Sequence, residues 1–458
     1  MKKSLKILYI GFGIKPFAMG GAIITQDFIM EEMIKRGHEV VSFLAAPRYF
    51  FRKNSFLKKW NRNGVKIIEL CNSPCRLGSQ NDPLIQCNHP IVEMMVRKIL
   101  KEERPDIVHI HELQLHPISI IDIIAEAGIK SVKTIHNYYD ICPQRDLFYR
   151  GKESCKFFPS TEHCAECMSV KSIKKHNGLF FLIKWGKNIT KYFISKKIID
   201  KYRTIRFPDK IIKDNDQEYN GNITPLYSSE KYDYRQKFFV NRLNKLDAIH
   251  CSTSRSAEIF SMAGVQKKII NIFPPSNKKI SDILPKSIMQ NNYPISFGYA
   301  GGFSLHKGYK VVLDAFSKLD QKKAKLIIWR NKKEELPSIF SDLNIEMREG
   351  EINDIFKEID VGIVPSIWEE VFGLIGPEFL SARIPVIGSR IGGIPEWLKD
   401  GENGFLVKPG DTDELAEKMN LFVKNPGLVA QFQKKIKVWK SFDEHVDETI
   451  ELYERLLK

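Results

Sequence analysis

The sequence predicts an α/β protein in which two Rossmann-like, doubly wound domains face each other across a cleft. Three observations lead to this prediction. The chain has 458 residues, more than one hydrophobic core usually organises. Two blocks of alternating apolar strands and helices follow one another, and a polar stretch at 277–292 separates them. We therefore expect an N-terminal domain over 1–290, a C-terminal domain over 291–440 and a final helix over 441–458.

The first block opens with a strand, a glycine-bearing loop and a helix. Residues 7–10 form a continuous apolar run, as expected of a parallel strand buried on both faces. A helix is expected over 22–35, with Gly37 as its C-terminal cap, and a strand over 39–43 completes a βαβ unit. The other elements predicted in this block are strands at 106–110, 131–135 and 248–251 and a helix at 118–127.

The second block repeats this alternation, which predicts a second doubly wound domain. Its expected elements are strands at 295–300, 325–329, 360–364 and 385–388 and a helix at 309–319. Nothing in the chain resembles a membrane span, because no apolar run reaches the length of about 18 residues that a bilayer requires. The N-terminal apolar run is too short for a signal peptide. We therefore expect a cytoplasmic protein.

A formal net charge of +16 calls for an explanation, and it is unevenly distributed. Residues 171–206 contain eleven Lys or Arg and a single acid, Asp200, with aromatic and aliphatic side chains between them. Such a mixture suits an anionic membrane surface, so we expect the protein to be peripheral on the inner face of the cell membrane. A solvated, lysine-rich insertion is the alternative. No recognised nucleic-acid motif is present, and nucleic acid is not an expected partner.

The segment 365–378 carries the clearest chemical pattern. A buried strand ends at Pro365, a glycine-containing turn follows, and a helix is expected to start near Gly376. Backbone N–H groups at a helix start form an anion site that fits a diphosphate. Glu370 and Glu378 bracket the turn, so that one carboxylate suits a sugar and the other a ribose diol. Simple helix capping is the alternative interpretation of this glutamate pair.

This segment resembles the paired-glutamate motif of glycosyltransferase family 4, a group of retaining enzymes with the GT-B fold. The stretches 384–388, 392–396 and 400–407 match the family as well. The likeness covers nearly the whole chain and is weakest at 45–100 and 168–240. It implies a GT-B fold in which the N-terminal domain holds the acceptor, the C-terminal domain binds the nucleotide sugar, and the C-terminal helix returns to the N-terminal domain. It also implies transfer of a sugar from a nucleotide sugar with retention, and chemistry that requires no metal.

The resemblance assigns roles to the residues of the donor motif. Glu370 is expected to contact the donor sugar, and Glu378 the ribose hydroxyls. The backbone between them is expected to lie against the diphosphate at Phe372, Gly373 and Leu374. Gly20 and Gly21 resemble the family's glycine pair, which lets the N-terminal loop approach the donor because no Cβ is in the way.

Two further segments match the family. The loop 301–308 resembles its phosphate-gripping loop, in which Lys307 stabilises charge on the leaving diphosphate. Many members carry an arginine after the first glycine, whereas this chain has Gly302 there, so one positive charge is either missing or supplied by His306 or another residue. His136, at the end of a predicted strand, matches a histidine close to the transferred sugar. His109 and His111, on the strand before, rank below it.

Four cysteines occupy an insertion that we place at about 140–240. Cys142, Cys155, Cys164 and Cys167 have the spacing C-x12-C-x8-C-x2-C, and the closing C-x2-C is typical of a structural zinc site. Disulfides are not expected in a reducing cytosol. Structural zinc, reduced thiols, and a cluster or redox role all remain open.

We expect a glycosyltransferase that uses a UDP- or GDP-sugar and a lipid-linked acceptor of surface polysaccharide synthesis. His136, Lys307 and Glu370 are the catalytic candidates. A nucleotide-sugar epimerase on the same fold is the main alternative. A basic, non-catalytic zinc protein that binds nucleic acid is the remote one, because it leaves the Glu370–Glu378 segment unexplained.

Overall fold

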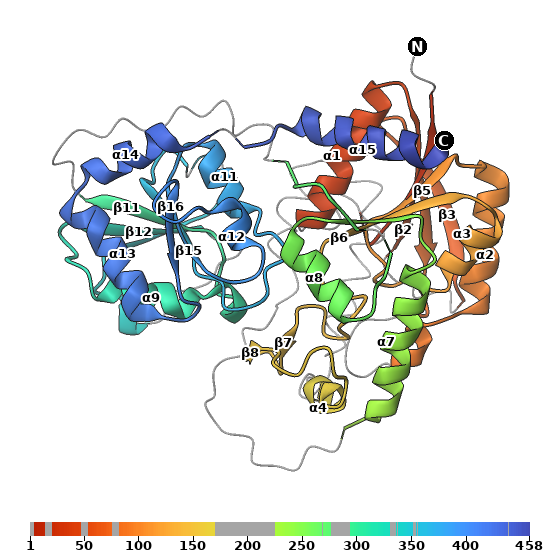
Figure 1. The fold of residues 1–458 in the computed structure, drawn as a ribbon, viewed down its shortest axis with the longest axis horizontal. Coiled ribbons are helices and arrows are strands. Elements are labelled where there is room, and N and C mark those ends of the chain that lie inside the picture. Colours follow the sequence, from red (N-terminus) through yellow and green to blue (C-terminus); the bar gives the residue numbers. More distant parts are fainter. Residues whose placement is uncertain are drawn as a thin grey trace.

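The computed structural model describes residues 4–13, 21–46, 54–75, 82–169, 225–267, 269–275, 294–329, 336, 338–350, 354, 356–437 and 439–458. Gly20, the expected linker at 277–292 and the basic segment at 171–206 lie outside these residues. The described chain forms two α/β domains side by side (Figure 1). No helix within the described ranges is long and apolar enough to cross a membrane.

The N-terminal domain is built on an eight-stranded sheet in the order β10-β9-β6-β5-β1-β2-β4-β3. All neighbouring strands are parallel except the edge strand β3, which runs antiparallel to β4. Its strands are β1 Lys6–Gly11, β2 Glu39–Ala45, β3 Phe56–Arg62, β4 Val65–Cys71, β5 Ile107–Ile110, β6 Lys130–Ile135, β9 Ala248–Cys251 and β10 Ile269–Asn271. Its helices are α1 Gly21–Lys35, α2 Pro90–Glu103, α3 Ile120–Glu126, α7 Ser229–Leu243 and α8 Ser254–Met262.

The C-terminal domain has a six-stranded parallel sheet in the order β13-β12-β11-β14-β15-β16. Counted along the chain this is the 3-2-1-4-5-6 order of a Rossmann fold, with its switch point between β11 and β14. The strands are β11 Ile295–Tyr299, β12 Ala324–Trp329, β13 Ile345–Arg348, β14 Val361–Val364, β15 Val386–Ser389 and β16 Gly404–Val407. The helices are α9 Tyr309–Ser317, α11 Ile375–Ser381, α12 Ile394–Trp397, α13 Thr412–Lys424 and α14 Gly427–Lys435.

The final helix, α15 Phe442–Leu457, packs on the N-terminal domain, as the resemblance implied (Figure 1). Ser441 and Glu444 form a capping box that fixes its start. Buried side chains of the helix, among them Val446 and Ile450, join the same core as Ile7 and Ile29. The Tyr453 hydroxyl hydrogen-bonds that of Tyr9 at 3.2 Å, so this helix completes the core of a domain whose first strand lies more than 400 residues away.

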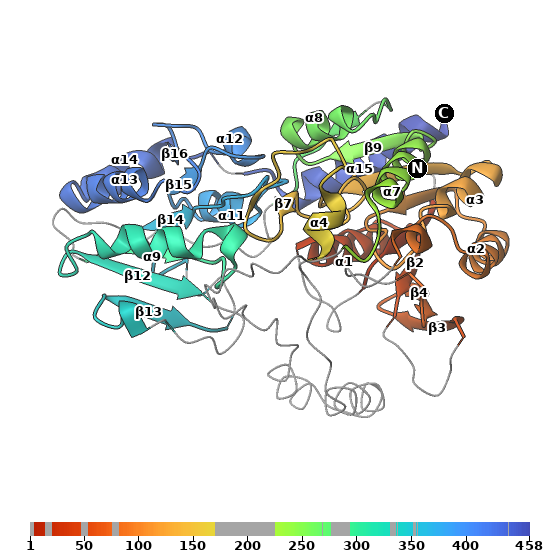
Figure 2. The same ribbon diagram turned by 90° about the horizontal axis from the view of Figure 1, so that it is seen from below.

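The cysteine-bearing insertion reaches toward the second domain. It contains the two-stranded hairpin of β7 Phe148–Tyr149 and β8 Glu153–Ser154, followed by α4 Cys164–Ser169. Figure 2 shows β7 between the two domains. The Ser154 hydroxyl donates a hydrogen bond of 2.8 Å to the carbonyl of Ile367 in the C-terminal domain. The insertion therefore touches the segment that carries the paired glutamates.

Candidate active site

A cavity of about 530 Å³ lies where the switch points of the two sheets face each other. In parallel sheets, loops that leave the carboxyl ends of strands on either side of a switch point form a ligand crevice. Here those loops follow β1, β5 and β6 in the N-terminal domain and β11 and β14 in the C-terminal domain. The predicted residues His136, Lys307 and Glu370 all line this one cavity, although the chain separates them widely.

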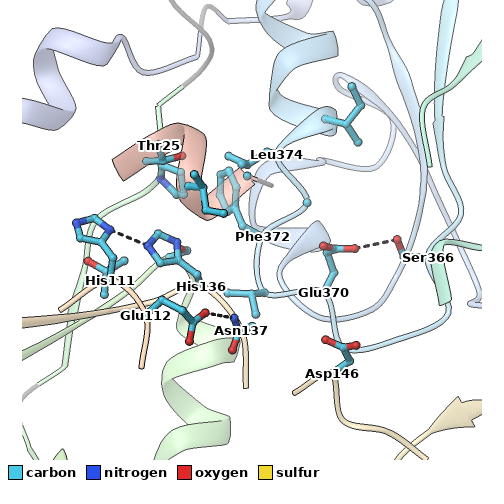
Figure 3. Close-up of a pocket in the computed structure, with 18 of the residues that line it drawn as sticks. Thr25, His111, Glu112, His136, Asn137, Asp146, Ser366, Glu370, Phe372 and Leu374 are labelled. Carbon is cyan, nitrogen blue, oxygen red and sulfur yellow. Dashed lines mark hydrogen bonds between the residues drawn. The ribbon is translucent and has the colours of Figure 1, made fainter. Parts of the chain in front are cut away.

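The Glu370 carboxylate is buried and held by three side chains. The Lys307 ammonium lies 2.9 and 2.8 Å from its two oxygens. Its Oε2 also accepts a hydrogen bond from the Ser366 hydroxyl at 3.1 Å (Figure 3). The Trp368 indole N–H donates another to the same oxygen, at 2.8 Å. The Lys307 side chain is 32 % exposed and that of Glu370 8 %. The site therefore holds an oriented carboxylate beside a cation that can still be reached from the cavity.

The backbone of Glu370 is fixed by the glycine pair that follows β15. The Gly393 N–H donates to the Glu370 carbonyl at 2.7 Å. Gly392 has φ 56° and lies so close that a Cβ there would come within 2.3 Å of that carbonyl oxygen. Glycine is required at this position both for its conformation and for the space it leaves. The matched stretch at 392–396 thus positions the donor motif.

Most of the other residues predicted to bind the donor line the cavity, but Glu378 does not. Gly21, Phe372, Gly373 and Leu374 line the cavity. A Cβ on Gly21 would lie 2.8 Å from Cδ1 of Leu374, so this glycine permits close contact between the two domains. Glu378, in the first turn of α11, is partly buried and is not among the residues that line the cavity. Burial raises the pKa of its carboxyl to about 7.

His136 lies on the N-terminal wall and forms a 2.9 Å hydrogen bond with His111 (Figure 3). Burial, with Lys133 and His250 as further causes, lowers the pKa of His136 to about 3. The other histidines around the cavity also have lowered pKa values, with burial as the main cause; they are His109, His111, His250, His306 and His445. At neutral pH these rings are uncharged. They can donate or accept hydrogen bonds but add no positive charge to the cavity.

Four polar residues of the N-terminal wall were not identified from the sequence. Glu112 accepts a 2.6 Å hydrogen bond from the Asn137 amide, and burial raises the pKa of its carboxyl (Figure 3). Arg145 pairs with Asp146, with Nε and Oδ1 3.0 Å apart. Glu112 and Asn137 follow the ends of β5 and β6, and that position was the signal available for finding them. Arg145 and Asp146 lie in the insertion, where no strand end marks them.

The four cysteines of the insertion lie near one another. Burial raises the pKa of the Cys142 and Cys164 thiols, and Cys142, Cys155 and Cys167 act on Cys164 electrostatically. Cys167 is hydrogen-bonded as a thiol, with Sγ 2.7 Å from Oε1 of Gln144. Among the described residues, no three His, Cys, Asp or Glu side chains are arranged to hold a metal ion. Zinc binding by these four cysteines stays a prediction.

Polar contacts join the two domains beside the cavity. The Glu396 carboxylate accepts hydrogen bonds from the backbone N–H groups of Ser254 and Arg255, at 2.9 and 2.8 Å. It therefore caps α8, a helix of the opposite domain. The Arg255 guanidinium also pairs with Glu369, next to the site glutamate, at 2.9 Å.

Comparisons with known proteins agree with this architecture. Residues 19–161 match the family model described as Glycosyltransferase Family 4, and residues 282–439 match that of Glycosyl transferases group 1. A Klebsiella pneumoniae protein described as an uncharacterized 42.6 kDa protein in the cps region is 24 % identical, over 88 % of this chain and 90 % of its own length.

Two solved structures show the same fold over nearly their whole length. Sucrose-phosphate synthase from Thermosynechococcus elongatus aligns with a TM-score of 0.62 at 13 % identity, covering 99 % of both chains. Anabaena HepE, solved in complex with UDP and glucose, aligns with a TM-score of 0.60 at 14 % identity, covering 98 % of this chain and 99 % of its own.

Proposed function

The chain is a GT-B glycosyltransferase of the family 4 type, and from this premise we propose that it moves a sugar, with retention, from a UDP- or GDP-linked donor to a lipid-linked intermediate of surface polysaccharide synthesis. The observation that carries the proposal is the Lys307–Glu370 pair, held at the carboxyl end of the C-terminal sheet and facing His136 of the other domain. A cation beside a buried carboxylate suits a leaving diphosphate next to a sugar.

Each residue then has a distinct task. Lys307 stabilises the negative charge that grows on the departing diphosphate, an interaction strongest in the transition state. Glu370, fixed by Ser366 and Trp368, orients the sugar through its hydroxyls. His136 is uncharged at neutral pH, so it hydrogen-bonds the sugar or the acceptor without repelling oxocarbenium-like charge. No step in this scheme requires a metal.

The choice of donor and acceptor rests on separate observations. HepE was solved with UDP, and the Klebsiella relative is described from a cps region. Together these favour a UDP-sugar and a polysaccharide pathway. The basic, aromatic-rich segment at 171–206 supports a lipid-linked acceptor at a membrane surface. The family match does not favour an epimerase.

Two experiments test the proposal. A thermal-shift screen with UDP, GDP, ADP and their sugars identifies the donor, since a ligand that binds only the folded state raises the melting temperature. Product analysis with the donor so found, with and without a membrane lipid extract, identifies the reaction. We expect a glycosylated lipid and release of the nucleoside diphosphate. An epimerised nucleotide sugar formed without acceptor would support the epimerase instead, and no response to any nucleotide would contradict both.

A further inference from the structure

The charges around the cavity do not match those of a diphosphate. Among the described residues that line it, the carboxylates are Glu112, Asp146 and Glu370, and the cations are Arg145 and Lys307. Gly302 stands where many family members have an arginine. Burial lowers the pKa of His306, so this ring is uncharged at neutral pH and does not supply the missing positive charge. Lys307 already shares its charge with Glu370. A second positive charge would complement a diphosphate bound here, and Arg145 is the other described cation in the wall.

We propose that Arg145, on the cysteine-bearing insertion of the N-terminal domain, binds the diphosphate of the donor together with Lys307. This inference rests on the proposed function and deepens it, because it assigns a donor contact to the domain expected to hold the acceptor. The arginine side chain is 48 % exposed and faces the cavity, whereas the side chain of its partner Asp146 is 17 % exposed. A planar guanidinium suits two phosphate oxygens at once.

The backbone around Arg145 is held in a strained conformation. Its φ is 84°, in the left-handed region that side chains other than glycine rarely adopt. Hydrogen bonds fix it there on both sides, from the Arg145 N–H to the Cys142 carbonyl and from the Tyr138 N–H to the Arg145 carbonyl, each 2.9 Å long. Strain that the surrounding structure maintains is concentrated at functional sites. Arg145 is held in this conformation at the wall of the cavity.

The same loop lies against the loop that carries Lys307. The Phe148 ring, three residues after Arg145, has its centroid 6.0 Å from that of His306. Both Arg145 and Asp146 act electrostatically on His306, so both lie near the residue that precedes Lys307. The two cations thus approach the same space from opposite domains, which suits a ligand bound between them.

The test is calorimetric titration of the full-length protein with UDP, GDP and ADP. Arg145→Gln should weaken binding of the preferred nucleoside diphosphate by about tenfold or more, because a charged hydrogen-bonding partner is lost. Arg145→Lys should recover part of that loss. Asp146→Asn should tighten binding, since it removes a carboxylate that competes for the guanidinium.

Arg150→Gln is the matched control. Arg150 belongs to the same insertion, also has a positive φ, of 51°, and pairs with Glu166 at 2.9 Å, but it does not line the cavity. Its variant should bind the nucleotide as the wild type does. Arg145→Gly separates binding from folding, because glycine accepts a φ of 84° without strain. This variant should keep or gain thermal stability while binding as poorly as Arg145→Gln.

Three results have distinct meanings. If the wild-type protein binds no nucleoside diphosphate, the proposed function fails. If the wild type binds one and Arg145→Gln binds it equally well, the inference about Arg145 fails and the proposed function stands. If Arg145→Gln keeps its nucleotide affinity and only the KM for the lipid acceptor rises, Arg145 belongs to the acceptor site, which also overturns the inference.

Discussion

The ammonium group of Lys307 lies within hydrogen-bonding distance of both carboxylate oxygens of Glu370, at 2.9 and 2.8 Å. In the proposed roles Lys307 contacts the diphosphate and Glu370 contacts the sugar. A bound donor would therefore contact both members of this ion pair. The two residues are therefore one unit, and their contributions to turnover should not be additive.

We first predict the effect of breaking this pair on kcat. Lys307→Met and Glu370→Gln should each lower kcat by about 100-fold to 1,000-fold, with smaller changes in KM, because the charge on the leaving group is greatest in the transition state. The double variant should lose much less than the product of the two effects. Ser366→Ala, which removes a neutral hydrogen bond to the same carboxylate, is the control and should cost far less. Fully multiplicative losses would show that the two residues act independently.

A second prediction concerns the pH dependence of stability at Glu378. Its pKa is raised to about 7, whereas a glutamate in the unfolded chain titrates near 4.5. The folded state therefore binds more protons between these values, and the free energy of unfolding falls as pH rises from about 4.5 to about 7. Glu378→Gln mimics the protonated form. Relative to this variant, the wild type should lose about 1–3 kcal/mol between pH 5 and pH 8 in urea denaturation. Parallel pH profiles for the two proteins would contradict the prediction.

Glu378 also serves to test the ribose assignment. If its carboxyl hydrogen-bonds the ribose hydroxyls, Glu378→Ala should weaken nucleotide binding by about tenfold, as expected for the loss of one strong hydrogen bond. Calorimetry with the nucleoside diphosphate identified by the thermal-shift screen measures this directly. An unchanged affinity would place the ribose elsewhere, in agreement with the position of Glu378 outside the cavity wall.

The zinc hypothesis for the insertion makes a separate prediction. Protein purified without added metal should contain about one zinc per chain, and Cys164→Ser with Cys167→Ser should remove it and expose the insertion to proteolysis. Cys75→Ser, a buried cysteine outside the cluster, should leave the zinc content unchanged. Metal-free protein of unchanged stability would instead establish the reduced thiols, with Cys167 bonded to Gln144 as the structure has it.

Another prediction concerns the contact between the domains at Glu396. Glu396→Ala removes the carboxylate that caps α8, so it should lower the free energy of unfolding by about 1 kcal/mol and weaken donor binding, because the two cavity walls lose a shared contact. Glu258→Ala is the matched control. That carboxylate pairs with Arg255 too, but its side chain is 60 % exposed, so its removal should have almost no effect.

The last prediction tests the basic segment at 171–206. Replacing Lys174, Lys175, Lys184 and Lys187 by Glu should abolish binding to vesicles that contain anionic lipid, and wild-type binding should fall as salt rises, because exposed charges are screened beyond about 8 Å. The control replaces four exposed lysines of the C-terminal domain: Lys399, Lys408, Lys434 and Lys435. It makes the same change in net charge and should leave vesicle binding intact. If both variants lost vesicle binding equally, the binding would depend on net charge alone and not on the segment 171–206.

The strands that were predicted in the two central sheets read as apolar runs, whereas β3, β4, β10, β13 and β16 were not predicted. The predicted strand at 248–251 has the bounds of β9, β1 is one residue longer than its prediction at each end, and β14 starts one residue later than predicted. The edge strand β3 was missed because its side chains are only partly buried and four of its seven residues are polar, so no apolar run marks it. Its turn, Asn63 and Gly64 with φ values of 47° and 82°, was the available signal.

The candidate site was predictable only as far as sequence motifs reach. Lys307, Glu370 and His136 lie at strand ends, which parallel sheets bring together. The partners of these residues could not be predicted, because a pattern of residue types says nothing about which loop faces which. The cap that Glu396 forms on a helix of the other domain and the position of Arg145 near His306 both depend on how one domain docks on the other.

The position of α15 constrains how this protein is made. Residues Val446, Ile450 and Tyr453 belong to the core of the N-terminal domain, which cannot close until the ribosome has released them. The C-terminal domain, whose strands all lie between residues 295 and 407, has no such requirement and can close first. The N-terminal domain is thus synthesised first but completes its core last. Until then, the apolar surface that α15 will cover is exposed and can be bound by chaperones.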